Sequence, residues 1–211
     1  MSGRLITLEG GEGAGKSTLL QGLRAYLAER GIEPLFTREP GGTALGEGVR
    51  ALVLDPALRG MCAESELLLM FAARAQLVRE SIRPALTAGQ WVVCDRFTDA
   101  SYAYQGGGRG QPRERIADLE RWAADGLQPD LTLLLDIPVD TGRARAAGRG
   151  EDSDRIEREG DGFFERIRAA YLQRAAEQPQ RFRVIDATQS PQQVLADAMA
   201  ALEPLLAGSK A

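Results

Sequence analysis

Residues 10–18 read GGEGAGKST, and this stretch decides the fold of the chain. It matches the pattern G-x-x-x-x-G-K-[ST], follows an apolar run at residues 5–8 and leads into a helix-like segment. A strand, a glycine-rich loop and a helix in this order form a phosphate-binding loop. The chain is therefore predicted to bind a nucleoside triphosphate. The alternative is a glycine-rich turn before a helix that happens to contain a lysine.

The residue types of this loop suit a triphosphate. Glycines let successive backbone N–H groups point inward, and the following helix adds the positive end of its dipole. Lys16, one of only two lysines in the chain, is expected to reach the β- and γ-phosphates, and the Ser17 hydroxyl is expected to hold Mg²⁺. The predicted triphosphate-binding residues are Gly10, Gly11, Glu12, Gly13, Ala14, Gly15, Lys16, Ser17 and Thr18.

Composition narrows the classes of protein and site. The 211 residues carry a net charge of −4, which argues against general nucleic-acid binding. The chain has no histidine, so a histidine base and a histidine metal site are excluded. Cys62 and Cys94 are too few and too far apart for a zinc site or a disulfide framework. No apolar signal segment and no run of membrane-spanning length is found, and we expect a cytoplasmic protein.

Apolar runs and turn residues predict alternating strands and helices. Strands are expected at residues 3–8, 33–37, 90–94, 131–136 and 181–186. Helices are expected at residues 17–30, 43–54, 64–88, 113–124, 139–147 and 163–178, with a last one starting at Ser190. Thr43 is expected to cap the second helix, Pro84 to kink or end the third, and residues 106–110 to form a flexible loop.

This alternation predicts an α/β fold. A five-stranded parallel sheet is expected to carry helices on both faces and a ligand at the carboxyl ends of its strands. We expect a single domain over residues 1–211, with a short charged lid at about residues 148–160.

Charged residues follow two of the expected strands at the ligand edge. Asp95 and Arg96 come directly after residues 90–94, and Arg38 follows residues 33–37. An arginine in such a place can bind a phosphate through two parallel hydrogen bonds. The alternatives are an ion pair at a strand end and, for Arg38, a surface arginine before a turn.

Two further groups have the spacing of a helix face. Phe71 and Arg74 are three residues apart, so a ring for stacking and a guanidinium for donating would lie side by side. Ser101, Tyr104 and Gln105 share a face if their segment is helical. The alternatives are a core phenylalanine with an outward arginine, and a polar loop ahead of the glycines.

Five stretches together resemble the bacterial thymidylate kinase family, and the resemblance covers nearly the whole chain. They are GGEGAGKST at residues 10–18, TREPGGT at 37–43, DRF at 95–97, YQGGGRG at 104–110 and PDLTLLLD at 129–136. The resemblance implies a P-loop kinase fold that binds ATP with Mg²⁺ and takes thymidine monophosphate (dTMP) as its acceptor. It also implies a homodimer formed through helices, for which the one expected at 64–88 offers a face.

The resemblance assigns roles at the phosphate end of the site. Arg96 would hold the acceptor phosphate and stabilise the transferring group, Asp95 would serve the metal or its waters, and Arg38 would also contact the acceptor phosphate. Glu12 is an unfavourable neighbour for a triphosphate and would instead accept from the 3′-hydroxyl of the acceptor sugar. Phe97 departs from the family pattern, which usually has tyrosine or histidine there; this removes a polar group and leaves the phosphate contact intact.

The resemblance assigns the base end as well. Phe71 would stack on thymine and Arg74 would donate to its O4. Ser101 and Gln105 would contact the base. Tyr104 would crowd the 2′ position of the sugar and so disfavour ribose.

Residues 143–159 contain five arginines and five acidic residues, so this segment is not a basic patch. The phosphate-binding loop has no arginine, and in the bacterial type that this chain resembles the lid supplies one. Arg149 and then Arg155 are the expected catalytic arginines, and Arg143 is expected to stack on adenine. The alternative is a solvated cluster of charges at a helix end.

The predicted reaction is transfer of the γ-phosphate of ATP to the 5′-phosphate of dTMP. The acceptor is already an oxyanion at neutral pH, so no strong general base is needed. Lys16, Mg²⁺, Arg96 and a lid arginine would act through alignment and charge neutralisation. Two alternatives stay open: a phosphotransferase for another small acceptor, and a nucleotide-dependent switch or partitioning protein.

Overall fold

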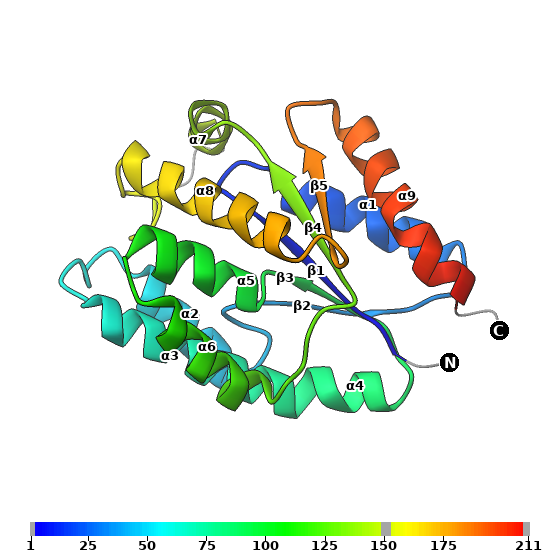
Figure 1. Ribbon diagram of the computed structural model, residues 1–211, viewed down its shortest axis with the longest axis horizontal. Helices are drawn as coiled ribbons and strands as arrows, with labels where there is room; N and C mark the ends of the chain where they lie inside the picture. The colour runs from blue at the N-terminus through cyan, green and yellow to red at the C-terminus, as the bar shows by residue number, and fades with distance from the viewer. Residues whose placement is uncertain (1–2, 149–152, 209–211) are drawn as a thin grey trace.

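Five parallel strands form the centre of the computed structural model, which describes residues 3–148 and 153–208. They lie in the order β2-β3-β1-β4-β5 (Figure 1). The strands are β1 (Leu5–Gly10), β2 (Leu35–Arg38), β3 (Val92–Asp95), β4 (Leu131–Asp136) and β5 (Phe182–Asp186). The predicted parallel sheet is confirmed. Because all its strands point the same way, the residues that follow β1, β2 and β3 meet at one edge.

The central strand β1 is buried on both faces. Ile6 and Leu8 point into the core that lies under α1 and α9, whereas Leu5 packs on the opposite side. Thr7 shares the side of Leu5, and its hydroxyl is hydrogen-bonded to Thr132 of β4 at 2.9 Å. The polar side chain is thereby satisfied inside the sheet, and β1 holds a fixed register beneath the phosphate-binding loop.

Helices cover both faces of the sheet (Figure 1). On one face lie α1 (Lys16–Ala28) and α9 (Pro191–Gly208). The opposite face carries α3 (Ala63–Leu77), α4 (Arg83–Thr87), α5 (Thr98–Ser101) and α8 (Asp161–Glu177). Three helices lie further out: α2 (Ala44–Leu54), α6 (Arg113–Ala124) and α7 (Val139–Ala147). The predicted bounds of α6, α7 and β4 match the structure residue for residue.

The helix expected at residues 64–88 is interrupted. A π-helical turn, η1 (Val78–Ile82), separates α3 from α4, and the N–H of Arg83 donates to the carbonyl of Val78, five residues back. Pro84 follows directly and has no N–H to continue the α-helical ladder. The predicted disturbance at Pro84 is confirmed, as is the cap at Thr43, whose Oγ1 accepts from the N–H of Gly46 at 2.9 Å.

The prediction of a flexible loop at residues 106–110 is wrong over most of its length. Tyr102–Gly108 form a second π-helical segment, η2, which continues α5. A Cβ on Gly107 would lie 2.7 Å from the backbone oxygen of Arg166, and one on Gly108 would lie 2.5 Å from the ring of Phe163. Close packing against α8, rather than a turn, therefore requires these glycines.

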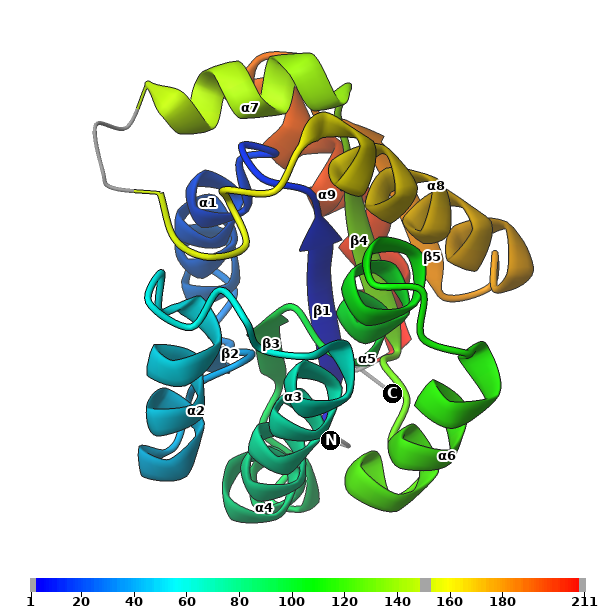
Figure 2. The ribbon, with the colours of Figure 1, turned by 90° about the vertical axis from the view of Figure 1, so that its left-hand side faces the viewer.

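The positions of α7 and of the segment 153–160 matter for the site. Figure 2 shows α7 lying across the molecule above the loop that follows β1, and the segment 153–160 passing from beside α2 towards α8.

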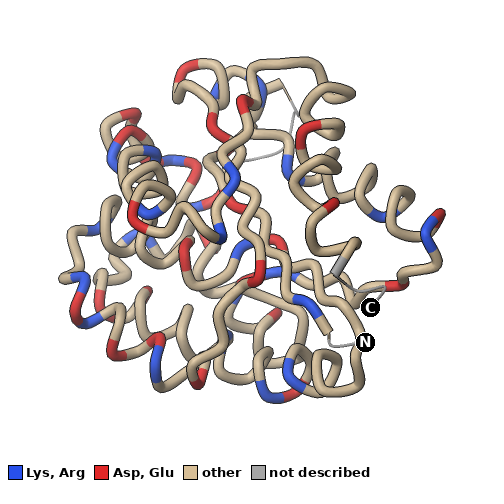
Figure 3. The backbone as a smooth tube through the Cα atoms, turned by 45° about the vertical axis from the view of Figure 1, so that its right-hand side comes forward, with Lys and Arg blue, Asp and Glu red and all other residues tan. Residues whose placement is uncertain are grey.

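Figure 3 shows basic and acidic positions interspersed along the chain. None of the helices within residues 3–148 and 153–208 combines the length and apolar character that a bilayer crossing requires.

Candidate functional site

The phosphate-binding loop is shaped by glycines with positive φ. Gly13 has φ 69° and Gly15 has φ 90°, values that side chains rarely adopt. A Cβ on Gly13 would lie 1.9 Å from the carbonyl oxygen of Gly142 on α7, and one on Gly142 would lie 2.4 Å from the carbonyl oxygen of Glu12. The loop is thus held directly against α7, backbone to backbone.

Lys16 begins α1 at the inner side of this loop. Its Nζ donates to the carbonyl oxygens of Gly10 and Gly11, both at 3.1 Å. Burial, together with the neighbouring charge of Arg96, lowers the pKa of Lys16 to about 8. A partly buried ammonium that donates to two carbonyl oxygens is suited to an incoming anion, because a phosphate would supply the negative charge that neutral carbonyls lack.

A cleft of about 950 Å³ opens from this loop, which is the size of a nucleotide-binding pocket. It reaches from the loop to the ends of β2 and β3 on one side and to the loop after β5 on the other. Its polar lining includes Glu12, Lys16, Ser17, Thr18, Arg38, Glu39, Arg50, Asp95, Arg96, Tyr104, Gln105, Arg145, Asp154, Glu157 and Gln189. Donor and acceptor sites predicted from separate motifs therefore share one space.

Arg96 occupies the centre of this cleft in a strained backbone conformation, with φ 69°. Its Nη1 donates to the carbonyl of Gly10 at 2.7 Å, and its Nη2 donates to Glu12 Oε1 at 3.0 Å and to the Tyr104 hydroxyl at 2.9 Å. The guanidinium also lies over the ring of Tyr104, 4.9 Å from its centre. The predicted phosphate-binding arginine is thus fixed between the loop and η2.

Sequence reasoning missed Glu9, which supports the turn at Arg96 from beneath. Glu9 Oε1 accepts from the N–H of Phe97 at 2.8 Å, and Oε2 accepts from the Tyr171 hydroxyl of α8 at 2.7 Å. Burial, together with the charge of Asp99, raises the pKa of Glu9 to about 8. The only signal in the sequence was a carboxylate at the end of an apolar strand.

The residues predicted to hold Mg²⁺ fit that ion. Asp95 Oδ1 is buried and has no hydrogen-bond partner, and both Asp95 and Ser17 line the cleft beside Lys16. Mg²⁺ prefers few protein ligands and takes its other oxygens from water and phosphate. Among the residues that the structure describes, no cluster of three or more acidic or thiol side chains offers a fuller metal cage.

Arg74 lies deep behind the acceptor side of the cleft, with no exposed surface. It donates to Glu39 Oε2 at 2.7 Å, to Ser101 Oγ at 3.0 Å and to the carbonyl of Phe97 at 3.0 Å. The ring of Phe71 lies 4.5 Å from its guanidinium. The structure therefore brings Phe71, Arg74 and Ser101 together and excludes an outward arginine. All three are buried and lie outside the cleft lining, which Tyr104 and Gln105 reach.

Arg38 lines the cleft at the end of β2, where about half of its side chain is exposed. Its Nη2 donates to Glu47 Oε2 at 2.9 Å, and Glu47 Oε1 accepts from the N–H of Gly42. Arg50 of α2 lines the same wall and was missed by sequence reasoning. Its signal was the shared helix face of Arg50, Val53 and Leu54, all of which line the cleft.

The arginines of the charged segment take different places. Arg149 lies outside the described residues. Arg155 is buried, and donates to the carbonyl of Val53 at 2.7 Å and to Glu66 Oε2 at 2.6 Å. Its backbone N–H donates to the carbonyl of Leu54 at 3.0 Å. The guanidinium of Arg155 is thus engaged by α2 and α3 and stands apart from the cleft lining.

Arg143 and Arg145 lie on opposite sides of α7. Arg143 donates to the carbonyl of Glu159 at 2.6 Å and lies over the ring of Phe164, 4.9 Å from its centre. Arg145 lines the cleft and donates to the carbonyl of Ala187 at 2.8 Å. Arg145 was not among the predicted site residues, although it belongs to the same run of arginines. Ala187 and Gln189 line the cleft beside Arg145, whereas Arg143 does not line it.

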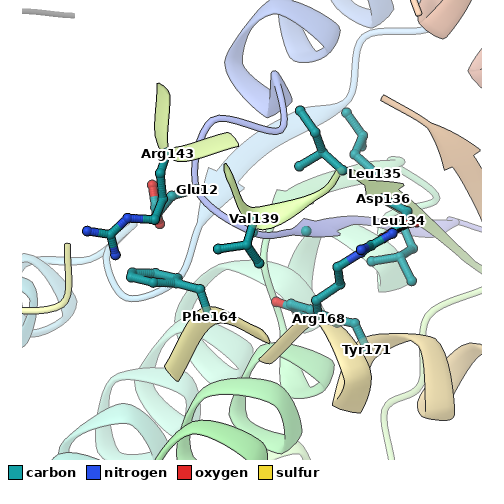
Figure 4. A pocket seen from close by; sticks show the side chains of 12 residues that line it. Glu12, Leu134, Leu135, Asp136, Val139, Arg143, Phe164, Arg168 and Tyr171 are labelled. Carbon is teal, nitrogen blue, oxygen red and sulfur yellow. Dashed lines mark hydrogen bonds and ion pairs between the residues drawn. The ribbon is translucent and has the colours of Figure 1, made fainter. Parts of the chain in front are cut away.

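A second cavity of only about 20 Å³ lies behind the phosphate-binding loop (Figure 4). Leu134, Leu135, Val139 and Phe164 belong to its apolar lining, and two further lining residues, Arg168 and Asp136, form an ion pair at 2.7 Å. This cavity holds no more than a water molecule, so the large cleft is the nucleotide-sized space.

The proteins to which this chain is similar are consistent with a nucleotide-binding cleft. Residues 8–198 match the sequence profile described as Thymidylate kinase. A thymidylate kinase of Ectopseudomonas mendocina (strain ymp) is 58% identical over 206 residues, which is 98% of each chain. One of Halorhodospira halophila is 56% identical over 205 residues, 97% of this chain and 95% of that protein. A crystal structure of thymidylate kinase from Ehrlichia chaffeensis has a TM-score of 0.77 at 31% identity, over 96% of this chain and 99% of that one.

Proposed function

The chain belongs to the thymidylate kinase family, and we propose how its residues carry out that family's reaction, the transfer of the ATP γ-phosphate to dTMP. The enzyme is a nucleoside monophosphate kinase whose product is dTDP. One observation carries the proposal. A single cleft has the phosphate-binding loop and Lys16 on one wall and Arg96 and Arg38 on another.

ATP is proposed to lie along the loop of residues 10–18. Backbone N–H groups and the amino end of α1 hold its phosphates, and Lys16 moves from the carbonyls of Gly10 and Gly11 onto the β- and γ-phosphate oxygens. Its adenine lies towards Arg145 and the loop at Ala187, with Arg143 available from the lid side. Mg²⁺, held by Ser17 and Asp95, supplies charge neutralisation at the phosphates when it is bound.

The acceptor phosphate is proposed to bind between Arg96 and Arg38. Arg96 already has a planar donor fork set by Gly10, Glu12 and Tyr104, so little rearrangement is needed to bind an oxyanion. When dTMP enters, Glu12 exchanges part of its bond to Arg96 for the 3′-hydroxyl of the sugar. The attacking phosphate oxygen carries no proton to remove, which suits a cleft without a histidine.

The base is proposed to lie over the buried group of Phe71, Arg74 and Ser101, with Gln105 and Tyr104 at its edge. Tyr104 then packs against the sugar at the 2′ position. Arg74 reaches the base after a local opening of the wall, because its side chain has no exposed surface. Residues 148–160 are proposed to act as the lid, and Arg149 and Arg155 as its candidate catalytic arginines.

A homodimer is proposed to form through α2, α3 and α6, and the enzyme to work in the cytoplasm. Both α2 and α6 pack against α3, and together they expose Leu45, Leu52, Leu68 and Trp122, the last with 78% of its surface. Large apolar side chains at this level of exposure favour association. Light scattering of the wild type and of Trp122→Glu checks this: a dimer that the substitution dissociates supports the surface, and a wild-type monomer contradicts it.

A panel of acceptors with MgATP tests the function directly. We expect dTMP to give the highest kcat/KM, above dUMP, dCMP, the ribose form of dTMP and dAMP. A better acceptor outside this thymidine type would contradict the proposal. Slow ATP hydrolysis with no transfer to any monophosphate would instead favour a nucleotide-dependent switch.

A further inference from the structure

Glu66 is a carboxylate with no exposed surface, on the first turn of α3. Three side chains from distant parts of the chain donate to it. Gln105 Nε2 lies 2.9 Å from Oε1, Arg109 Nε lies 3.1 Å from Oε2, and Arg155 Nη2 lies 2.6 Å from Oε2. A carboxylate is seldom fully buried unless it is paired, and here its charge is met by two guanidiniums.

Stability of the helix end does not explain this burial. Glu64 lies two residues earlier in the same turn, where a negative charge also favours the helix dipole, and it is exposed. It accepts from Gln111 Nε2 at 3.0 Å, so the chain repeats the same glutamate–glutamine pair at its surface. The buried copy differs in that Glu66 also accepts from Arg109 and Arg155, and in that its glutamine, Gln105, lines the nucleotide cleft.

The buried pair sets the direction of the Gln105 amide. An ionised carboxylate only accepts hydrogen bonds, so the amide must turn its NH₂ group towards Glu66. Its carbonyl oxygen, Oε1, is left over, is buried, and has no hydrogen-bond partner. An unpaired buried acceptor on a cleft wall favours a ligand that offers a donor, because an unmade bond at such an atom is costly.

We propose that Glu66 is a positioning residue that fixes the amide of Gln105 with its oxygen free for the acceptor base, and so selects a pyrimidine that carries N–H at ring position 3. Thymine has that donor, whereas cytosine has an acceptor nitrogen there. The inference rests on the proposed function, since it requires the base of dTMP beside Gln105. The same carboxylate holds Arg155, so packing of residues 153–160 onto α2 and α3 and orientation of Gln105 occur together.

The test is Glu66→Gln, read as the ratio of kcat/KM for dTMP to kcat/KM for 5-methyl-dCMP. These acceptors share the methyl group, sugar and phosphate and differ only at positions 3 and 4. A glutamine at 66 can meet either end of the Gln105 amide, so the ratio is expected to fall about tenfold or more, mainly through KM for dTMP. Arg74 is the same in both proteins, so its reading of position 4 cancels from the comparison.

Glu64→Gln is the matched control, and its ratio is expected to equal that of the wild type. An unchanged ratio in a folded Glu66→Gln protein, or the same fall in Glu64→Gln, would overturn the inference. A wild type without activity on dTMP would instead overturn the proposed function. If Glu66→Gln does not fold, Gln105→Ala keeps the pair of Glu66 with Arg155, and a wild-type ratio in that variant would equally overturn the inference.

Discussion

The two walls of the cleft are built from different materials. The donor wall is backbone: glycines with positive φ, N–H groups and a single lysine. The acceptor wall relies on arginines, and three of these are paired with a carboxylate in the protein, namely Arg96 with Glu12, Arg74 with Glu39 and Arg38 with Glu47. Among the described residues Lys16 donates only to carbonyl oxygens, whereas the charges of these three arginines are each balanced by a carboxylate.

This difference has a physical reason. Arg74 is fully buried and Arg96 is largely buried, and a buried arginine without a partner would destabilise the fold before any substrate arrives, so these two need carboxylates of their own. The lysine can lower its pKa and lose its proton instead, and burial lowers the pKa of Lys16 in this way. Substitutions on the donor wall should therefore affect the reaction alone, whereas those on the acceptor wall should also affect stability.

Lys16→Ala should give the largest effect on the reaction. We expect kcat/KM for ATP to fall by about 1,000-fold or more, because Lys16 is the only lysine within the described residues 3–148 and 153–208, with little change in thermal stability. Steady-state kinetics and a thermal melt check this. Arg24→Ala, a cation on the same helix that lies over Phe36, is the control. Activity within tenfold of the wild type would show that the phosphate-binding loop has been misassigned.

Arg96→Lys should give the next largest effect. It tests the planar set of N–H donors of the guanidinium, because lysine keeps the positive charge. Lysine cannot bond Gly10, Glu12 and Tyr104 in the same plane, so we expect kcat to fall by about 100-fold while KM for ATP changes little. Arg38→Lys, at a half-exposed position, should cost less. Equal losses in the two variants would contradict the central place given to Arg96.

Arg74→Ala should separate stability from acceptor binding. Removing it leaves Glu39 buried and unpaired, and we expect a loss of about 3 kcal/mol in the free energy of unfolding as well as a raised KM for dTMP. The double variant Arg74→Ala, Glu39→Gln should regain most of the stability and keep the raised KM. Chemical denaturation and acceptor kinetics measure the two effects, and recovery of both together would reduce Arg74 to a structural role.

The smallest effect expected is a pH dependence. ATP binds the protonated form of Lys16, so kcat/KM for ATP should fall by up to tenfold per pH unit above the pKa of about 8 in the free enzyme. At saturating ATP the phosphates hold the proton, and kcat should stay flat over the same range. Glu9 also has a pKa of about 8, so Glu9→Gln is the control; loss of the pH dependence in that variant would assign it to Glu9.

The donor wall could be predicted from the sequence because its parts are consecutive. The glycine pattern, Lys16 and Ser17 lie within nine residues, and the strand before them and the helix after them were found at nearly their true bounds. Two arginines of the acceptor wall, Arg38 and Arg96, also lie at strand ends that periodicity reveals. Periodicity does not reveal which residues pair: Glu39 lies 35 residues from Arg74, and Glu9 lies 88 residues from Phe97, whose N–H it accepts from.

The same distance explains the wrong prediction at residues 106–110. A run of glycines is typical of a flexible loop, and only contact with α8, some 60 residues away, makes it a packing surface. Arg155 is a similar case. Its place in a charged segment predicts a lid residue near phosphate, whereas its partners Val53 and Glu66 lie about a hundred residues earlier in the chain.

The contact between Gly13 and Gly142 has a consequence for motion. With no side chain between the two backbones, the phosphate-binding loop and α7 have no room to slide past each other, so their thermal fluctuations are shared. A nucleotide that reduces the motion of the loop must also reduce the motion of α7. Amide hydrogen exchange should therefore slow in both when ATP binds. Because α7 leads into the charged segment, ATP bound at the loop reduces the motion of this helix without any contact between ATP and an arginine of the segment.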